Sequence, residues 1–152
     1  MGEEYEKYLR FTIVRNPWDW AVSNFHYNGG LHRPFIEGST VAQSSTQPDW
    51  VKAMGFKKWL KWWLETLKPS QKKMITNADG ELIVDEVLKF EYLQTHFNKL
   101  CKQISISIPN ALPHLESSVR SENYRGYYDT DTRDLIQSCF EWEIESFDYT
   151  FD

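Results

Sequence analysis

An arginine and a serine eight residues apart, Arg15 and Ser23, are the side chains in this sequence whose types and spacing best suit an anion. Arg15 follows a short apolar run, and Asn16–Pro17 then signals a helix start, because Asn is a favourable N-cap and Pro fits the first helical position. Free N–H groups at a helix start, the helix dipole and an arginine fork all favour phosphate. Arg15 can equally pair with a nearby carboxylate, in which case the segment holds no ligand.

The elements that must position this pair are a strand, a tight turn and a helix. Residues 9–14 are apolar and rich in β-branched side chains, which predicts a strand buried on both faces. Asp19 falls in the first helical turn, where a carboxylate suits the positive end of the helix dipole. Ser23 lies off the apolar helix face, which is formed by Trp18, Ala21, Val22 and Phe25.

The segment RNPWDWAVSNFHY resembles the 3′-phosphate-binding segment of sulfotransferases that use 3′-phosphoadenosine 5′-phosphosulfate (PAPS). In that family a strand is followed by Arg-Asn/Asp-Pro and by a Ser eight residues after the Arg; the matching positions are Arg15, Asn16, Pro17 and Ser23. A second block is similar to the C-terminal part of carbohydrate-type sulfotransferases. It comprises LPHLESS at 112–118, YRGYY at 124–128 and ESFDYTF at 145–151.

The resemblance implies that Arg15 and Ser23 hold the 3′-phosphate of PAPS or of its product, adenosine 3′,5′-bisphosphate. It also implies further phosphate contacts from Arg120 and Ser118, and an aromatic neighbour of the adenine at Phe90. The acceptor would be a hydroxyl group of a carbohydrate or a small alcohol. Simpler alternatives remain, since Arg120 can be a solvated loop charge and Phe90 can fill the core.

The sequence departs from the family pattern before Arg15. No Gly-rich or Lys-Ser/Thr loop that would hold the 5′-phosphosulfate precedes it, and neither does a His. We therefore expect a single, incomplete sulfotransferase-like domain over residues 1–152, with a truncated α/β, P-loop-like fold that is mostly helical with a small sheet. No residue is a convincing catalytic base, and His26 and His32 have simpler surface or structural roles. The alternative is a catalytically inactive nucleotide-binding or protein-interaction module derived from that fold.

Composition narrows the range of functions further. A net charge of −5 over 152 residues argues against broad nucleic-acid binding, which needs a basic face. Two cysteines, Cys101 and Cys139, are too few for a disulfide framework, and their helical contexts predict buried free thiols. No apolar run is long enough for a transmembrane segment and the first residues are charged, so we expect no signal peptide and, for a complete chain, a cytoplasmic location.

A second amphipathic pattern follows a loop-like stretch, residues 29–50, which the resemblance to sulfotransferases implies would line the acceptor side. Its apolar positions predict a helix that ends at Pro69: Phe56, Trp59, Leu60, Trp63, Leu64 and Leu67. The stripe either packs in the core with Trp62 partly exposed or, because Lys and Trp suit a lipid interface, lies on a membrane. A third reading makes the face of Trp59 and Trp63 a surface for binding a partner.

The remaining patterns predict a β-hairpin and two helices. Residues 72–76 and 81–85 flank Asp79–Gly80, a strong hairpin signal. A helix is expected over 92–104, and a last helix starts near 129–131, capped by Asp129 or Thr130, and runs to about residue 147. The many aromatic residues suggest apolar surface, so a homo-oligomer would pair beside residues 9–14.

Overall fold

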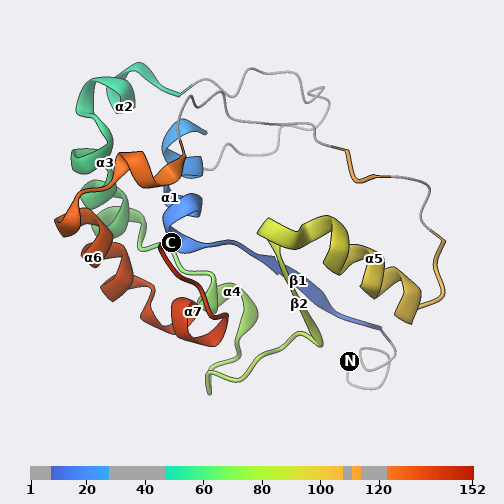
Figure 1. Ribbon diagram of the computed structural model, residues 1–152. Helices are drawn as coiled ribbons and strands as arrows, with labels where there is room; N and C mark the ends of the chain where they lie inside the picture. Colours follow the sequence, from blue (N-terminus) through green and yellow to red (C-terminus); the bar gives the residue numbers. More distant parts are fainter. Residues whose placement is uncertain (1–7, 28–46, 108–110, 114–122) are drawn as a thin grey trace, which may run out of the picture. The chain divides into compact units, whose positions relative to one another are not determined.

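A computed structural model describes residues 8–27, 47–107, 111–113 and 123–152 (Figure 1). The chain divides into two compact units, and each is described by itself. The first comprises Met1–Asn16 and Ser70–Leu115, and the second comprises Pro17–Pro69 and Glu116–Asp152. The described residues are mostly helical with one small parallel sheet, which confirms the predicted α/β class and its helical bias.

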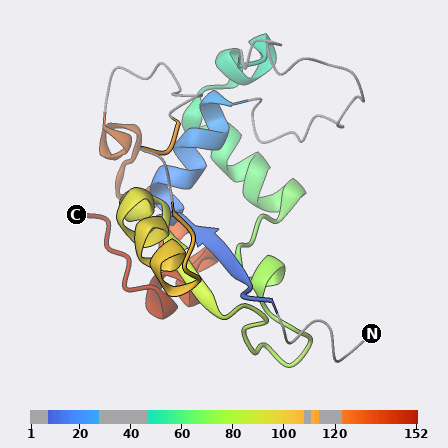
Figure 2. The same ribbon diagram turned by 90° about the vertical axis from the view of Figure 1, so that its right-hand side faces the viewer.

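The first unit is built on a two-stranded parallel sheet. Strands β1 (Phe11–Val14) and β2 (Glu86–Lys89) pair in register from Phe11 opposite Glu86 to Val14 opposite Lys89. Helix α5 (Leu93–Gln103) runs alongside the strands in both views (Figures 1 and 2). The short helix α4 (Lys72–Ile75) and the 3₁₀ turn η4 (Phe90–Tyr92) complete the unit. Its buried apolar side chains are Val14, Ile75, Leu88, Leu100 and Cys101.

The prediction that β1 is buried on both faces is wrong. Phe11 and Ile13 keep 44% and 46% of their surface exposed, and only Val14 is fully buried in the strand. Among the described residues β1 has β2 as its single strand neighbour, and Phe97 of α5 reaches Phe11 at a ring-centroid distance of 6.4 Å. One helix therefore covers this face of β1 only in part.

The predicted hairpin strands at 72–76 and 81–85 are also not formed, and strand β2 begins only at Glu86. Residues 72–75 form α4, and the antiparallel pairing shrinks to one bridge between Thr76 and Leu82. Helix geometry is favoured here because the Ser70 hydroxyl accepts a hydrogen bond from the Lys73 N–H at 3.2 Å. The turn itself is as expected, with Gly80 at a positive φ of 83°.

The second unit is helical. Its elements are α1 (Pro17–His26), α2 (Asp49–Met54), α3 (Phe56–Trp62), the π-helical turn η3 (Trp63–Leu67), the 3₁₀ turn η5 (Tyr124–Tyr127), α6 (Thr130–Cys139) and α7 (Glu141–Ser146). The predicted apolar face of α1 is buried throughout. Trp59 and Trp63 are buried and stacked, with ring centroids 5.3 Å apart, while Trp62 is partly exposed. The core interpretation of this stripe is therefore confirmed for Trp59, Leu60 and Trp63, whereas Leu67 at its end is 38% exposed.

The predicted last helix is two helices. Phe140, with φ −120° and ψ 27°, has a non-helical backbone conformation and separates α6 from α7. Asp129 is the N-cap of α6, and a capping box links its side chain with Thr132. Of the two predicted caps, Asp129 and Thr130, Asp129 is thus the correct one. Cys101 is a buried free thiol, but Cys139 is exposed, because the buried stripe of α6 runs through Thr132, Ile136 and Phe140.

Candidate functional site

The carboxyl ends of the two parallel strands bring Arg15 and Phe90 together. Val14 pairs with Lys89 as the last residue of each strand, so the next residue of each segment emerges at the same sheet edge. The Arg15 guanidinium carbon lies 4.3 Å from the centroid of the Phe90 ring, within cation–π range. Arg15 is partly buried and Phe90 is 42% exposed. Ligands of open α/β sheets generally bind outside the carboxyl ends of the strands.

Gln71 holds the backbone of Arg15. The Arg15 N–H donates to Gln71 Oε1 at 2.8 Å, and Gln71 Nε2 donates to the Arg15 carbonyl oxygen at 2.9 Å. Gln71 is only 8% exposed, so water competes weakly for these bonds. One side-chain amide thus satisfies both backbone groups of Arg15, which fixes the position from which the guanidinium projects.

Glu91 makes a second link across the sheet edge. Its Oε1 accepts a hydrogen bond from the Asn16 N–H at 2.7 Å. The carboxylate therefore occupies a backbone donor that an incoming phosphate could otherwise use, and its charge opposes an anion nearby. The edge thus presents a cation, an aromatic ring and a carboxylate, rather than a purely basic cradle.

The residues expected to bind the nucleotide are not all brought together by the described structure. Arg15 belongs to the first unit, whereas Ser23 belongs to the second, partly buried on α1. Their joint contact with one phosphate stays a prediction. Ser118 and Arg120 lie outside the described residues.

Both described histidines, His26 and His96, are engaged in hydrogen bonds within the protein. His26 exchanges a hydrogen bond with the Tyr127 hydroxyl at 2.8 Å and packs edge-on against its ring, which is a structural role. His96 Nδ1 accepts a bond from the Lys89 N–H at 3.0 Å, which places the proton of the neutral ring on Nε2. In that tautomer the outer nitrogen of His96 donates a proton and cannot accept one. His32 lies outside the described residues.

Sequence reasoning missed Gln71 and Glu91. Gln71 is 56 residues from Arg15 along the chain, and no local pattern marks it as the partner of a strand end. Glu91 directly follows Phe90 in the segment expected to run near the adenine, so the resemblance pointed to its neighbourhood but not to its role.

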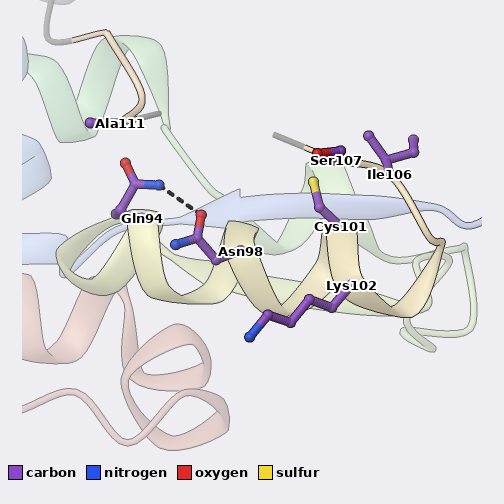
Figure 3. Close-up of a pocket in the computed structure, with 7 residues that line it drawn as sticks. All are labelled: Gln94, Asn98, Cys101, Lys102, Ile106, Ser107 and Ala111. Atoms are coloured by element: carbon purple, nitrogen blue, oxygen red, sulfur yellow. Dashed lines mark hydrogen bonds between the residues drawn. The ribbon is translucent and has the colours of Figure 1, made fainter. Parts of the chain in front are cut away.

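A separate pocket lies on α5. It is an open depression of about 590 Å³ and involves neither Arg15 nor Phe90. Figure 3 shows Gln94 hydrogen-bonded to Asn98, with the Cys101 sulfur pointing toward the segment that carries Ser107. Its lining is Gln94, Asn98, Cys101, Lys102, Ile106, Ser107 and Ala111. The described residues contain no group of three or more His, Cys, Asp or Glu side chains able to hold a metal ion.

No family model, curated protein or solved structure matches this chain. Within the described ranges, no helix is long and apolar enough to cross a membrane.

Proposed function

We propose that the edge formed by Arg15, Phe90 and Glu91 binds the adenosine 3′,5′-bisphosphate part of PAPS, and that the protein is a sulfotransferase-like member of the P-loop-like class. The single observation that supports this proposal most is the Arg15 guanidinium lying 4.3 Å over the Phe90 ring at the carboxyl edge of a parallel strand pair. A guanidinium offers a phosphate two parallel N–H donors, and exposed ring surface offers a base an apolar contact.

The role of Arg15 is positional. It holds the nucleotide but does not touch the reacting sulfur, as the resemblance implies. Bound PAPS would supply the sulfuryl group, whose S–O bond to phosphate breaks as a bond to the acceptor oxygen forms, with the hydroxyl proton passing to a base. Because the described histidines have other roles, a catalytically inactive nucleotide-binding module is the second candidate. Both candidates predict nucleotide binding, and only the first predicts turnover.

Calorimetric titration with adenosine 3′,5′-bisphosphate at low salt tests the proposal. We expect micromolar binding by the wild-type chain and a loss of about 10- to 100-fold in Arg15→Ala, since a hydrogen bond to a charged group contributes about 1.5–3 kcal/mol. Arg15→Lys keeps the charge but lacks the planar fork, so it should restore little of the affinity. Adenosine 5′-monophosphate, which lacks the 3′-phosphate, should bind more weakly.

Arg10→Ala is the matched control. It removes the same charge from the residue just before β1, at the opposite end of the strand from Arg15. If Arg10→Ala and Arg15→Ala weaken binding equally, the effect is general electrostatics and the proposal fails. It also fails if the wild-type chain binds no bisphosphate. Transfer of labelled sulfate to carbohydrate or alcohol acceptors then separates the enzyme from the inactive module.

A further inference from the structure

The surface of α2 and α3 carries one exposed tryptophan, Trp50, and one partly exposed tryptophan, Trp62. Trp50 of α2 is 41% exposed, and its ring meets that of Trp62 of α3 edge-on, with centroids 5.1 Å apart at an angle of 80°. Trp62 is itself only partly buried. The two helices lie next to each other within the second unit (Figure 1). These two indoles therefore keep surface that is accessible to a partner, whereas Trp59 and Trp63 are fully buried in the core.

Three lysines accompany this pair. Lys58 lies one helical turn before Trp62, Lys61 directly precedes it, and Lys68 follows the π-helical turn. All three are exposed and form no ion pair with the residues that the structure describes. Lys57 differs, because its ammonium is held by Asp129 at 2.6 Å. We call Trp50, Trp62, Lys58, Lys61 and Lys68 the Trp–Lys surface.

The Trp–Lys surface is a basic patch on an acidic chain. Residues 49–68 contain five lysines and two carboxylates, but Lys52 pairs with Asp49 and Lys57 pairs with Asp129. Three lysines against Glu65 leave a local charge of +2, whereas the whole chain carries −5. Screening confines the reach of exposed charges to about 10 Å at 0.1 M salt, so a partner senses the local sign rather than the net charge. The carboxylates of this segment are Asp49, which pairs with Lys52, and exposed Glu65.

We propose that the Trp–Lys surface docks on an anionic lipid bilayer. Indoles favour the headgroup level of a membrane, where one part of the ring is apolar and the N–H stays hydrated. Ammonium groups close to that level are attracted by anionic headgroups. The exposed indole of Trp50 and the partly exposed indole of Trp62, next to lysines that form no ion pair with the described residues, match this layered environment. The proposal is independent of the nucleotide site, because all its residues belong to the second unit.

Sedimentation of the full chain with phosphatidylcholine vesicles, with and without phosphatidylserine, tests the proposal. We expect binding only to the anionic vesicles, weakened by salt. The double variant Lys58→Gln/Lys61→Gln should bind about 30-fold more weakly, because each cation near an anionic surface contributes roughly a factor of five. The control Lys99→Gln/Lys102→Gln changes the same charge at the same helical spacing on α5 and should bind like wild type.

Trp50→Gln separates insertion of the indoles from simple charge attraction. Trp50 is substantially exposed, so this variant should keep the fold by circular dichroism and still lose vesicle affinity. Unchanged vesicle binding by Trp50→Gln, or equal losses in the two lysine double variants, would overturn the proposal. Binding to heparin or single-stranded DNA without binding to anionic vesicles would overturn it as well, in favour of an anionic polymer.

Discussion

Replacing Gln71 by alanine should loosen the end of β1, because one amide satisfies both backbone groups of Arg15. The substitution removes the acceptor of the Arg15 N–H at 2.8 Å and the donor to the Arg15 carbonyl at 2.9 Å. Both backbone groups are partly buried and Gln71 is nearly inaccessible, so water replaces the lost partners incompletely. At about 1 to 1.5 kcal/mol for each bond, we expect a loss of about 2–3 kcal/mol.

The assay must report on the first unit. All seven tryptophans lie at positions 18, 20, 50, 59, 62, 63 and 142, within the second unit, so intrinsic fluorescence follows that unit alone. Native-state hydrogen exchange of the β1 and β2 amides measures the free energy of opening the sheet directly. Gln71→Ala should lower it, whereas Gln103→Ala, which removes an exposed contact to Glu86 at 3.3 Å, should change it by less than about 0.5 kcal/mol.

Gln71→Glu tests the same reasoning by the direction of its pH dependence. The ionised carboxylate of this variant can still accept a hydrogen bond from the Arg15 N–H, but its second oxygen is repelled by the Arg15 carbonyl oxygen. The protonated acid can instead donate a hydrogen bond to that carbonyl oxygen. Folding therefore favours the protonated form, and the stability of this variant relative to wild type should rise as pH falls from about 7 toward 4. The proposed role of the Gln71 clamp, the two hydrogen bonds from the Gln71 amide to the Arg15 backbone, would be refuted by either of two results. One is an equal pH dependence of stability in Gln71→Glu and wild type, and the other is a stability loss below about 0.5 kcal/mol in Gln71→Ala.

Two further predictions concern the start of β1 and the tryptophan core. Hydrogen bonds from the Arg10 side chain and N–H lower the pKa of Asp85 from 3.8 to about 2. The pair therefore stabilises the fold above pH 3.8, and this contribution disappears as pH falls toward 2. In Arg10→Ala, an NMR titration should show the pKa of Asp85 rising toward 3.8 without reaching it, because the backbone N–H of residue 10 still donates to the carboxylate. Trp59→Ala should cost about 3–5 kcal/mol in urea unfolding followed by fluorescence, and Trp62→Ala much less, because Trp59 is fully buried and Trp62 only partly. Similar losses for the two would contradict the described core.

The elements that the sequence predicts well are those with a strong local signal. The apolar stripes of α1 and α3 recur at helical spacing, and Asp129 has a suitable capping partner three residues later. The errors arise where packing against distant parts of the chain determines the secondary structure or the burial of a segment. Residues 72–75 suit a strand by composition, but the Ser70 hydroxyl and a buried Ile75 favour a short helix. The exposure of Phe11 and Ile13 depends on how much of β1 the neighbouring elements cover, which no local pattern encodes.

The candidate site shows the same division. Arg15 is marked by its place between a strand and a helix start, whereas Phe90 is expected either to fill the core or, as the resemblance implies, to neighbour an adenine. Their contact at 4.3 Å arises because β1 and β2 are parallel and end together, a pairing between segments some 75 residues apart. The Gln71 clamp has no sequence signal of its own, since glutamine is common and its partner is backbone.

The chemistry of this edge limits what it can hold. Arg15 favours an anion, but Glu91 takes the Asn16 N–H and repels a bare anion, so a simple phosphate ion gains little here. A ligand fits better if it carries a phosphate for Arg15, a hydroxyl that can donate to the Glu91 carboxylate, and an apolar ring for Phe90. A carboxylate accepts several hydrogen bonds, so the bond from Asn16 does not prevent another. Phosphate, ribose and base are the three parts of a nucleotide, which is why the proposed ligand is a nucleotide rather than a free anion.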